Sequence, residues 1–171
     1  VVESRPGEII FGLTMLVSKG RTVFVADTNV HDNPTAEQLV EIAISSTRVA
    51  RLFGFDPKVA FLSHSTFGKP STVRTKHVKK AIELMKSKKI DFDYDGEMQP
   101  DVALDPDYKE SYPFSKIVGN ANILIMPALH SASISVKLMK TFGGARLIGP
   151  LLIGLGLPIE VAPLRSSPSE I

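Results

Sequence analysis

A hydroxyl-rich segment at positions 63–69, Ser-His-Ser-Thr-Phe-Gly-Lys, holds residue types that suit an anion-binding site. The apolar run before it, 59–62, is too short for a helix and is typical of a strand buried on both faces. Ser65 and Thr66 offer hydroxyl groups, and Gly68 lets the backbone approach a ligand closely. Lys69 adds a positive charge just before a predicted helix, whose first amide groups lack partners. The segment therefore predicts a site for a phosphate-bearing ligand.

An alternative remains open, because serine and threonine before a helix are also common caps of its first amides. The spacing of a P-loop is absent, and so is the Gly-x-Gly-x-x-Gly of dinucleotide-binding folds. No Gly-x-Ser-x-Gly elbow offers a hydrolase nucleophile. The segment favours ligand binding over nucleotide hydrolysis or dinucleotide binding.

A second strand-to-helix crossing occurs at 127–133, Pro-Ala-Leu-His-Ser-Ala-Ser. His130 and Ser131 could line a ligand site there, although a surface histidine near a helix cap is the alternative. Lys137 is expected about one turn into the following helix, with Lys140 three residues on. Two ammonium groups near a helix start interact unfavourably with the helix dipole. A bound anion would offset this repulsion, or the long side chains would simply extend into water.

Metal chemistry finds little support in the sequence. Asp91, Asp93, Asp95 and Gly96 match the first half of a calcium-binding EF-hand loop, but Val102 stands where a bidentate glutamate is needed. No zinc spacing joins any two of the four histidines, which are His31, His64, His77 and His130. We therefore expect no metal site.

Composition limits the class of protein. The chain has 171 residues, 43% of them hydrophobic, and no cysteine, which fits a globular protein of a reducing cytoplasm. No apolar run is long enough to span a membrane. A basic block at 74–89 is followed by an acidic block at 91–107, and the two largely cancel, so we expect no nucleic-acid partner. The absence of an initial methionine and the Ser-Pro-Ser-Glu at 167–170 favour a fragment of a longer protein.

Alternating strand and helix patterns predict an α/β layer fold with a largely parallel sheet. Strands are expected at 23–26, 59–62, 122–126, 147–153 and 159–162. A long helix should begin at Asn-Pro-Thr, 33–35, and end at Gly54, with further helices bearing Val78 and Met85 inward and spanning about 133–142. The irregular stretch 96–115 could carry a short helix or a functional loop.

Taken together, several segments resemble the phosphate acetyl/butyryltransferase family. They run in family order over roughly 23–158, which is most of the chain. The matching segments are Val-Ala-Asp (25–27), Pro-Thr-Ala-Glu-Gln-Leu (34–39), Val-Ala-Phe-Leu-Ser-His-Ser-Thr (59–66), Asp-Gly-Glu-Met-Gln-Pro-Asp (95–101), Gly-Asn-Ala-Asn-Ile-Leu-Ile-Met-Pro (119–127) and Gly-Pro-Leu-Leu (149–152). The segments 18–28 and 94–98 resemble most closely the version fused to the carboxyl end of bacterial malic enzymes.

This resemblance implies a three-layer, mostly parallel α/β fold of the isocitrate/isopropylmalate dehydrogenase type. It implies two lobes, with coenzyme A and acyl phosphate in the cleft between them. Positions 23–158 would form the inserted second lobe, and 159–171 would return toward the first. Family members pair through this lobe, so the resemblance also implies a homodimer or a higher homo-oligomer.

The resemblance matches some of the family's functional residues in this chain and leaves others without a match. Lys137 matches a coenzyme-binding lysine, but Thr141 stands where the family has an arginine. Active members carry Asp-Leu-Ser-Arg-Gly at the last strand, where this chain reads Ala-Pro-Leu-Arg-Ser at 162–166. When the chain is aligned to the family without a gap, Pro163 replaces the serine and Leu164 the arginine. A one-residue shift would place Arg165 at the arginine position, but would not restore the Ser-Arg pair.

Loss of that serine and arginine implies binding without transfer, since acyl transfer needs alignment and charge neutralisation. The expected function is an acetyl-CoA-binding regulatory domain of a malic enzyme, with NADP and a divalent metal held elsewhere in the parent. An active phosphate acetyltransferase and a purely oligomerising module are the alternatives. The residues expected to bind the coenzyme are Ser65, Thr66, Gly68, Lys69, His130, Ser131, Lys137 and Arg165.

Overall fold

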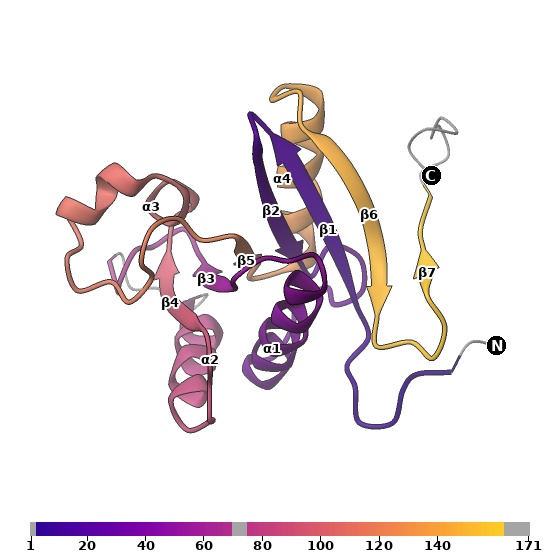
Figure 1. Ribbon diagram of the computed structural model, residues 1–171. Coiled ribbons are helices and arrows are strands. Elements are labelled where there is room, and N and C mark those ends of the chain that lie inside the picture. Colours follow the sequence, from indigo (N-terminus) through magenta and orange to yellow (C-terminus); the bar gives the residue numbers. More distant parts are fainter. Residues whose placement is uncertain (1–2, 70–74, 163–171) are drawn as a thin grey trace.

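A mixed β-sheet forms the centre of the computed structural model, which describes residues 3–69 and 75–162 (Figure 1). Within these ranges the sheet has seven strands in the order β4-β3-β5-β2-β1-β6-β7. The strands are β1 (Phe11–Ser18), β2 (Arg21–Ala26), β3 (Lys58–Leu62), β4 (Asp93–Met98), β5 (Ile123–Ile125), β6 (Arg146–Ile153) and β7 (Ile159–Glu160). The helices are α1 (Ala36–Leu52), α2 (Lys76–Lys86), α3 (Pro100–Leu104) and α4 (Leu129–Thr141), with a 3₁₀ helix at Pro106–Glu110.

The sheet is parallel in one half only. β2, β5, β3 and β4 pair in parallel, whereas β1 pairs antiparallel with both β2 and β6, and β6 with β7. The expectation of a largely parallel sheet is therefore wrong. β1, which the sequence reading missed, joins β2 through a two-residue turn at Lys19 and Gly20, both with positive φ, as tight hairpins require.

Helices cover both faces of the sheet and give three layers. On one face, α1 and α2 pack over β2, β3 and β5 through a core that includes Leu39, Ile42, Phe61, Val78 and Ile125. On the other face, Ala132 and Val136 of α4 and Ala103 of α3 pack against Leu62 and Leu124. Burial of apolar area on both faces is the main force that fixes the strands.

Local signals placed α1 well and α4 less well. Thr35 caps α1 in a capping box with Gln38, so Pro34 lies before the cap and not in the first turn. α4 starts at Leu129, one turn before the predicted start near 133, and its cap residue Ala128 supplies no side-chain hydrogen bond. β6 runs through Gly149 and Pro150 without interruption.

In the part of the chain that the structure describes, no helix is both long and apolar enough to cross a membrane.

Candidate ligand cavity

A cavity of about 740 Å³ lies at the carboxyl ends of β3 and β5. These two parallel strands are neighbours in the sheet, with Phe61 opposite Ile125, so the segments that follow them emerge side by side. Carboxyl ends of parallel strands are where α/β folds usually bind ligands. The cavity is lined by Asn33, Pro34, Leu62, Ser63, His64, His77, Pro100, Met126, Pro127, Ala128, His130, Ser131 and Ser135.

Three imidazole rings from three separate segments line this cavity. His64 follows β3 and His130 lies in the first turn of α4, and both are exposed. His77 comes from α2, and its Nε2 lies 3.0 Å from the carbonyl oxygen of Pro127. Because a carbonyl can only accept, that nitrogen carries a proton and donates it, which ties α2 to the end of β5.

The start of α4 faces the same cavity through Ala128, His130 and Ser131. Ser131 Oγ donates to the carbonyl oxygen of Ala128 at 2.6 Å, so its proton serves the helix's own first turn. Ser63 Oγ instead lies 3.3 Å from Ser65 Oγ. Both hydroxyls thus bond to groups other than an imidazole, and the lining resembles a binding site more than a nucleophile paired with a base.

The hydroxyl-rich segment is used differently from the prediction. Ser65 is fully buried and its hydroxyl donates to Glu97 Oε1 at 3.0 Å, while the Gly68 amide donates to the same oxygen at 2.8 Å. Thr66 Oγ1 accepts from the Gln99 amide at 3.2 Å. Ser65 and Gly68 thus bind a carboxylate of the chain itself and Thr66 a backbone amide, and their neighbours Ser63 and His64 line the cavity instead. Direct ligand contact by Ser65, Thr66 and Gly68 stays a prediction that this conformation does not support.

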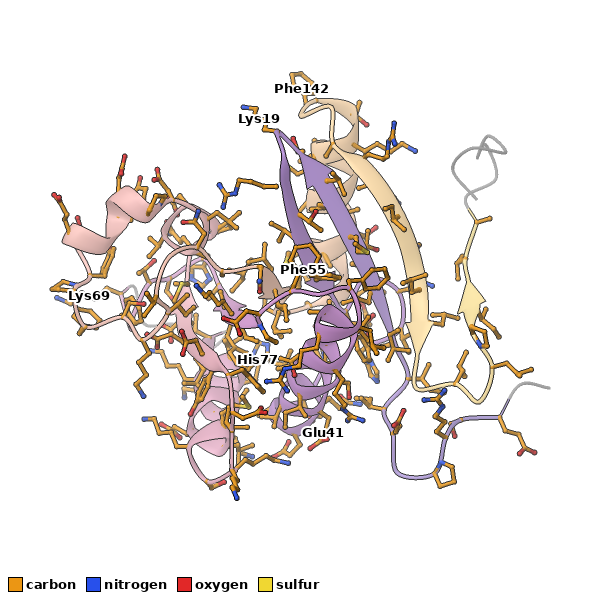
Figure 2. The ribbon with its side chains drawn as sticks, viewed as in Figure 1. Lys19, Glu41, Phe55, Lys69, His77 and Phe142 are labelled. Carbon is orange, nitrogen blue, oxygen red and sulfur yellow. The ribbon has the colours of Figure 1, made fainter. Side chains whose placement is uncertain are left out.

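The predicted lysines lie away from the cavity lining. Lys69 is exposed, and Figure 2 shows it on the outer side of its loop. Lys137 is also exposed, and because α4 begins at Leu129 it lies in the third turn, so the expectation of Lys137 near a helix start is wrong. Lys140 lies in the last turn, where a positive charge suits the helix dipole. Arg165 falls outside the described residues.

A second cavity, of about 540 Å³, adjoins the first between the β1–β2 hairpin and α4. The two cavities share Leu62, Pro100, Met126 and Ser135. The second is lined mainly by aliphatic side chains, including Leu16, Val23, Leu124, Val136 and Met139, and it is bordered by Lys19 and Arg21.

Charge and metal chemistry are sparse around the main cavity. The lining residues carry no carboxylate, lysine or arginine within the ranges 3–69 and 75–162. Among these same residues no group of three or more histidine, aspartate or glutamate side chains could hold a metal ion. The arrangement can bind a polar or anionic ligand through imidazoles, hydroxyls and the start of α4.

The chain is similar in sequence to known proteins. The sequence pattern of the family described as phosphate acetyl/butaryl transferase matches residues 1–170. An NADP-dependent malic enzyme of Rhizobium meliloti is 44% identical over 99% of this chain and 22% of its own length. A phosphate acetyltransferase of Clostridium acetobutylicum is 36% identical over 94% of this chain and 51% of its length.

A solved structure is also similar to this chain in both fold and sequence. A phosphotransacetylase from Streptococcus pyogenes superposes with a TM-score of 0.90 and 31% identity, over 99% of this chain and 53% of that one. The chain therefore spans about half or less of the length of the relatives it matches.

Proposed function

The chain belongs to the phosphate acetyl/butaryl transferase family, and we propose that it is an acetyl-CoA-binding regulatory domain of an NADP-dependent malic enzyme without transferase activity of its own. The observation that carries the proposal is the cavity at the ends of β3 and β5, which is large and brings imidazoles and hydroxyls together but has no carboxylate, lysine or arginine among its described lining residues. Such a lining suits recognition more than reaction.

The cavity fits a coenzyme A ligand in size and chemistry. Its volume of about 740 Å³ lies within the range usual for cofactor sites. His64 and His130 can donate hydrogen bonds to phosphate oxygens, and the uncapped start of α4 adds backbone amides. The adjoining aliphatic cavity could take the apolar part of the same ligand. Coenzyme A combines phosphates with a long neutral arm, so both parts find suitable surroundings.

Absence of transfer follows from the sequence at 162–166. Pro163 and Leu164 occupy the positions at which active members are expected to carry serine and arginine. Without these groups, alignment of the acyl phosphate and neutralisation of its charge both suffer. An active phosphate acetyltransferase remains the second candidate, because the enzyme of Clostridium acetobutylicum is 36% identical over 94% of this chain.

The rest of a malic enzyme would supply NADP and a divalent metal in parts that this chain does not span.

Self-association is part of the same proposal. α4 exposes Ile134, Leu138 and Phe142, with Phe142 93% exposed at the end of the helix (Figure 2). Pairing of this apolar face with a second copy would remove it from water.

Calorimetric titration of acetyl-CoA into the full-length parent protein, with acetyl-phosphate-to-CoA transfer assayed on the same sample, tests the function. Saturable binding without turnover is the expected result. Ser131→Trp should abolish binding because the indole fills the cavity mouth. Leu52→Trp, at the end of α1, 85% exposed and outside the lining of both cavities, should bind normally.

Each alternative has its own outcome in these assays. Turnover of acetyl phosphate would establish the transferase and refute the regulatory proposal. No binding at millimolar acetyl-CoA would refute both ligand-based functions. Equal affinity of Ser131→Trp and Leu52→Trp would place the ligand away from this cavity.

A further inference from the structure

The loop 63–68, which follows β3 at the cavity, is held by hydrogen bonds to one three-residue segment, 97–99. Each of the six residues from 63 to 68 forms a hydrogen bond to that segment. The bonds are Ser63 N to Met98 O at 2.9 Å, Gln99 Nε2 to His64 O at 2.7 Å, Ser65 Oγ to Glu97 Oε1 at 3.0 Å, Gln99 N to Thr66 Oγ1 at 3.2 Å, Phe67 N to Glu97 O at 2.8 Å, and Gly68 N to Glu97 Oε1 at 2.8 Å.

Glu97 is the buried anchor of this arrangement. Its residue exposure is 3%, and one of its carboxylate oxygens accepts from both a hydroxyl and an amide of the loop. Lys79 Nζ of α2 lies 3.7 Å from that same oxygen and offsets the charge. A buried carboxylate with hydrogen bonds and a counter-charge is held in one geometry, because any loosening leaves polar groups unpaired.

Gln99 fixes the part of the loop nearest the cavity. Its side-chain amide donates to the carbonyl oxygen of His64, which sets the backbone at that residue. The imidazole of His64 is left exposed and lines the cavity, next to Ser63. The hydrogen bond is therefore made by the backbone, while the side chain is presented to a ligand.

We propose that Glu97 and Gln99 are positioning residues that hold 63–68 in the shape that presents Ser63 and His64 to the ligand cavity. The identity of the ligand rests on the proposed coenzyme A function, whereas the loop geometry does not. A loop ordered before binding loses less conformational freedom when the ligand arrives, and this raises affinity. Glu97 thus accepts the hydrogen bonds of the Ser65 hydroxyl and the Gly68 amide, two donors that the sequence assigned to a ligand phosphate.

The substitution Gln99→Glu tests the donor at nearly constant shape, because a carboxylate cannot donate to the His64 carbonyl. Gln38→Glu is the matched control, since Gln38 uses its side-chain oxygen only to accept from the Thr35 amide, and glutamate keeps that acceptor. Glu97→Gln keeps an acceptor for Ser65 and Gly68, whereas Glu97→Ala removes it. Glu41→Gln, at a half-exposed glutamate paired with Lys88, controls for loss of charge.

Amide hydrogen exchange over 63–68 and calorimetric titration of coenzyme A are measured on the same folded variants. Gln99→Glu and Glu97→Ala should speed exchange of the loop and weaken coenzyme A binding, each by about tenfold, the effect of losing one well-placed interaction. Glu97→Gln should retain most of both properties, and the two controls should match the unmodified chain. A purely structural role would lower the unfolding midpoint and leave the affinity of the folded variant unchanged.

Two results would overturn the proposal. One is loop exchange in Gln99→Glu equal to that in Gln38→Glu. The other is faster exchange with unaltered coenzyme A affinity. Both measurements use the full-length parent protein. If the unmodified parent fails to bind coenzyme A, the proposed function falls, and the exchange measurements alone still decide whether Glu97 and Gln99 order the loop.

Discussion

Replacing Asp27 with asparagine should destabilise the protein strongly, although the two side chains have the same shape. Asp27 follows β2 and is 3% exposed. Its Oδ1 accepts from the amides of Gly12, Asn29 and Val30 at 2.9, 2.8 and 3.1 Å. Its Oδ2 accepts from both the amide and Nδ1 of His31 at 2.7 Å. An asparagine can supply an acceptor at only one of these two positions.

The cost can be worked from these five bonds. If the asparagine oxygen takes the Oδ1 position, its NH₂ group faces two donors of His31 at hydrogen-bonding distance. Leaving a buried backbone amide unpaired costs about 1–3 kcal/mol, and the three bonds that remain lose the strength that a charged acceptor gives. We expect a total loss of about 3 kcal/mol in the free energy of unfolding. The opposite rotamer would orphan three amides and cost more.

Urea unfolding at neutral pH provides the measurement. With a slope of about 2 kcal/mol per molar urea, the midpoint should fall by about 1.5 M. Asp32→Asn is the control, because Asp32 is exposed in the same loop and makes a weak 3.4 Å contact to Asn33. That substitution should change stability by less than about 0.5 kcal/mol. A loss below about 1 kcal/mol for Asp27→Asn, or an equal loss for Asp32→Asn, would refute the reasoning.

Three further predictions concern the helices. The hydrogen bond from Lys80, 2.9 Å away, holds the pKa of the Glu37 carboxyl below its usual range, so Lys80→Met should raise that pKa in an NMR titration. Since this pKa is lowered by folding, its contribution to stability is present above the unfolded pKa and is lost as pH falls through the folded value, and Lys80→Met should reduce that pH dependence. Thr35→Ala should remove the α1 capping box and cost about 1 kcal/mol in urea unfolding, whereas Thr35→Ser should retain most of it. Ile134→Glu should shift sedimentation toward smaller species if the exposed face of α4 mediates self-association, and an unchanged profile would argue against that surface.

Sequence patterns predicted elements whose signals are local. The helix from 33–35 to Gly54 was predicted because Leu39, Ile42 and Ala43 repeat at helical spacing, and in α1 these three residues are buried. The start of α4 was misplaced because Ala128 offers no capping side chain to mark it. β1 was missed because its place depends on pairing with both β2 and β6, and β6 lies far along the chain. Long-range pairing leaves little trace in a short window of sequence.

The residues of the candidate site also differ in whether a local sequence signal or a distant partner decides their position. His130 and Ser131 were predicted because a strand followed by a helix marks the carboxyl edge of a sheet, and the structure places both in the cavity lining. Ser65 and Gly68 were assigned to a ligand because their partner, Glu97, lies 32 and 29 residues away and no local pattern connects them. A hydroxyl-rich loop shows that donors exist, but the acceptor they meet is decided by tertiary structure.

The position of β1 between β2 and β6 also has a consequence for synthesis of the chain. The hairpin of β1 and β2 can close soon after both strands leave the ribosome, but the other edge of β1 pairs with residues 146–153. At typical elongation rates the second partner follows after roughly ten seconds. Throughout that interval an apolar strand that includes Leu13 and Met15 presents an unpaired edge. The nascent protein is therefore most exposed to aggregation before β6 is made, and chaperones that shield strand edges would act in that window.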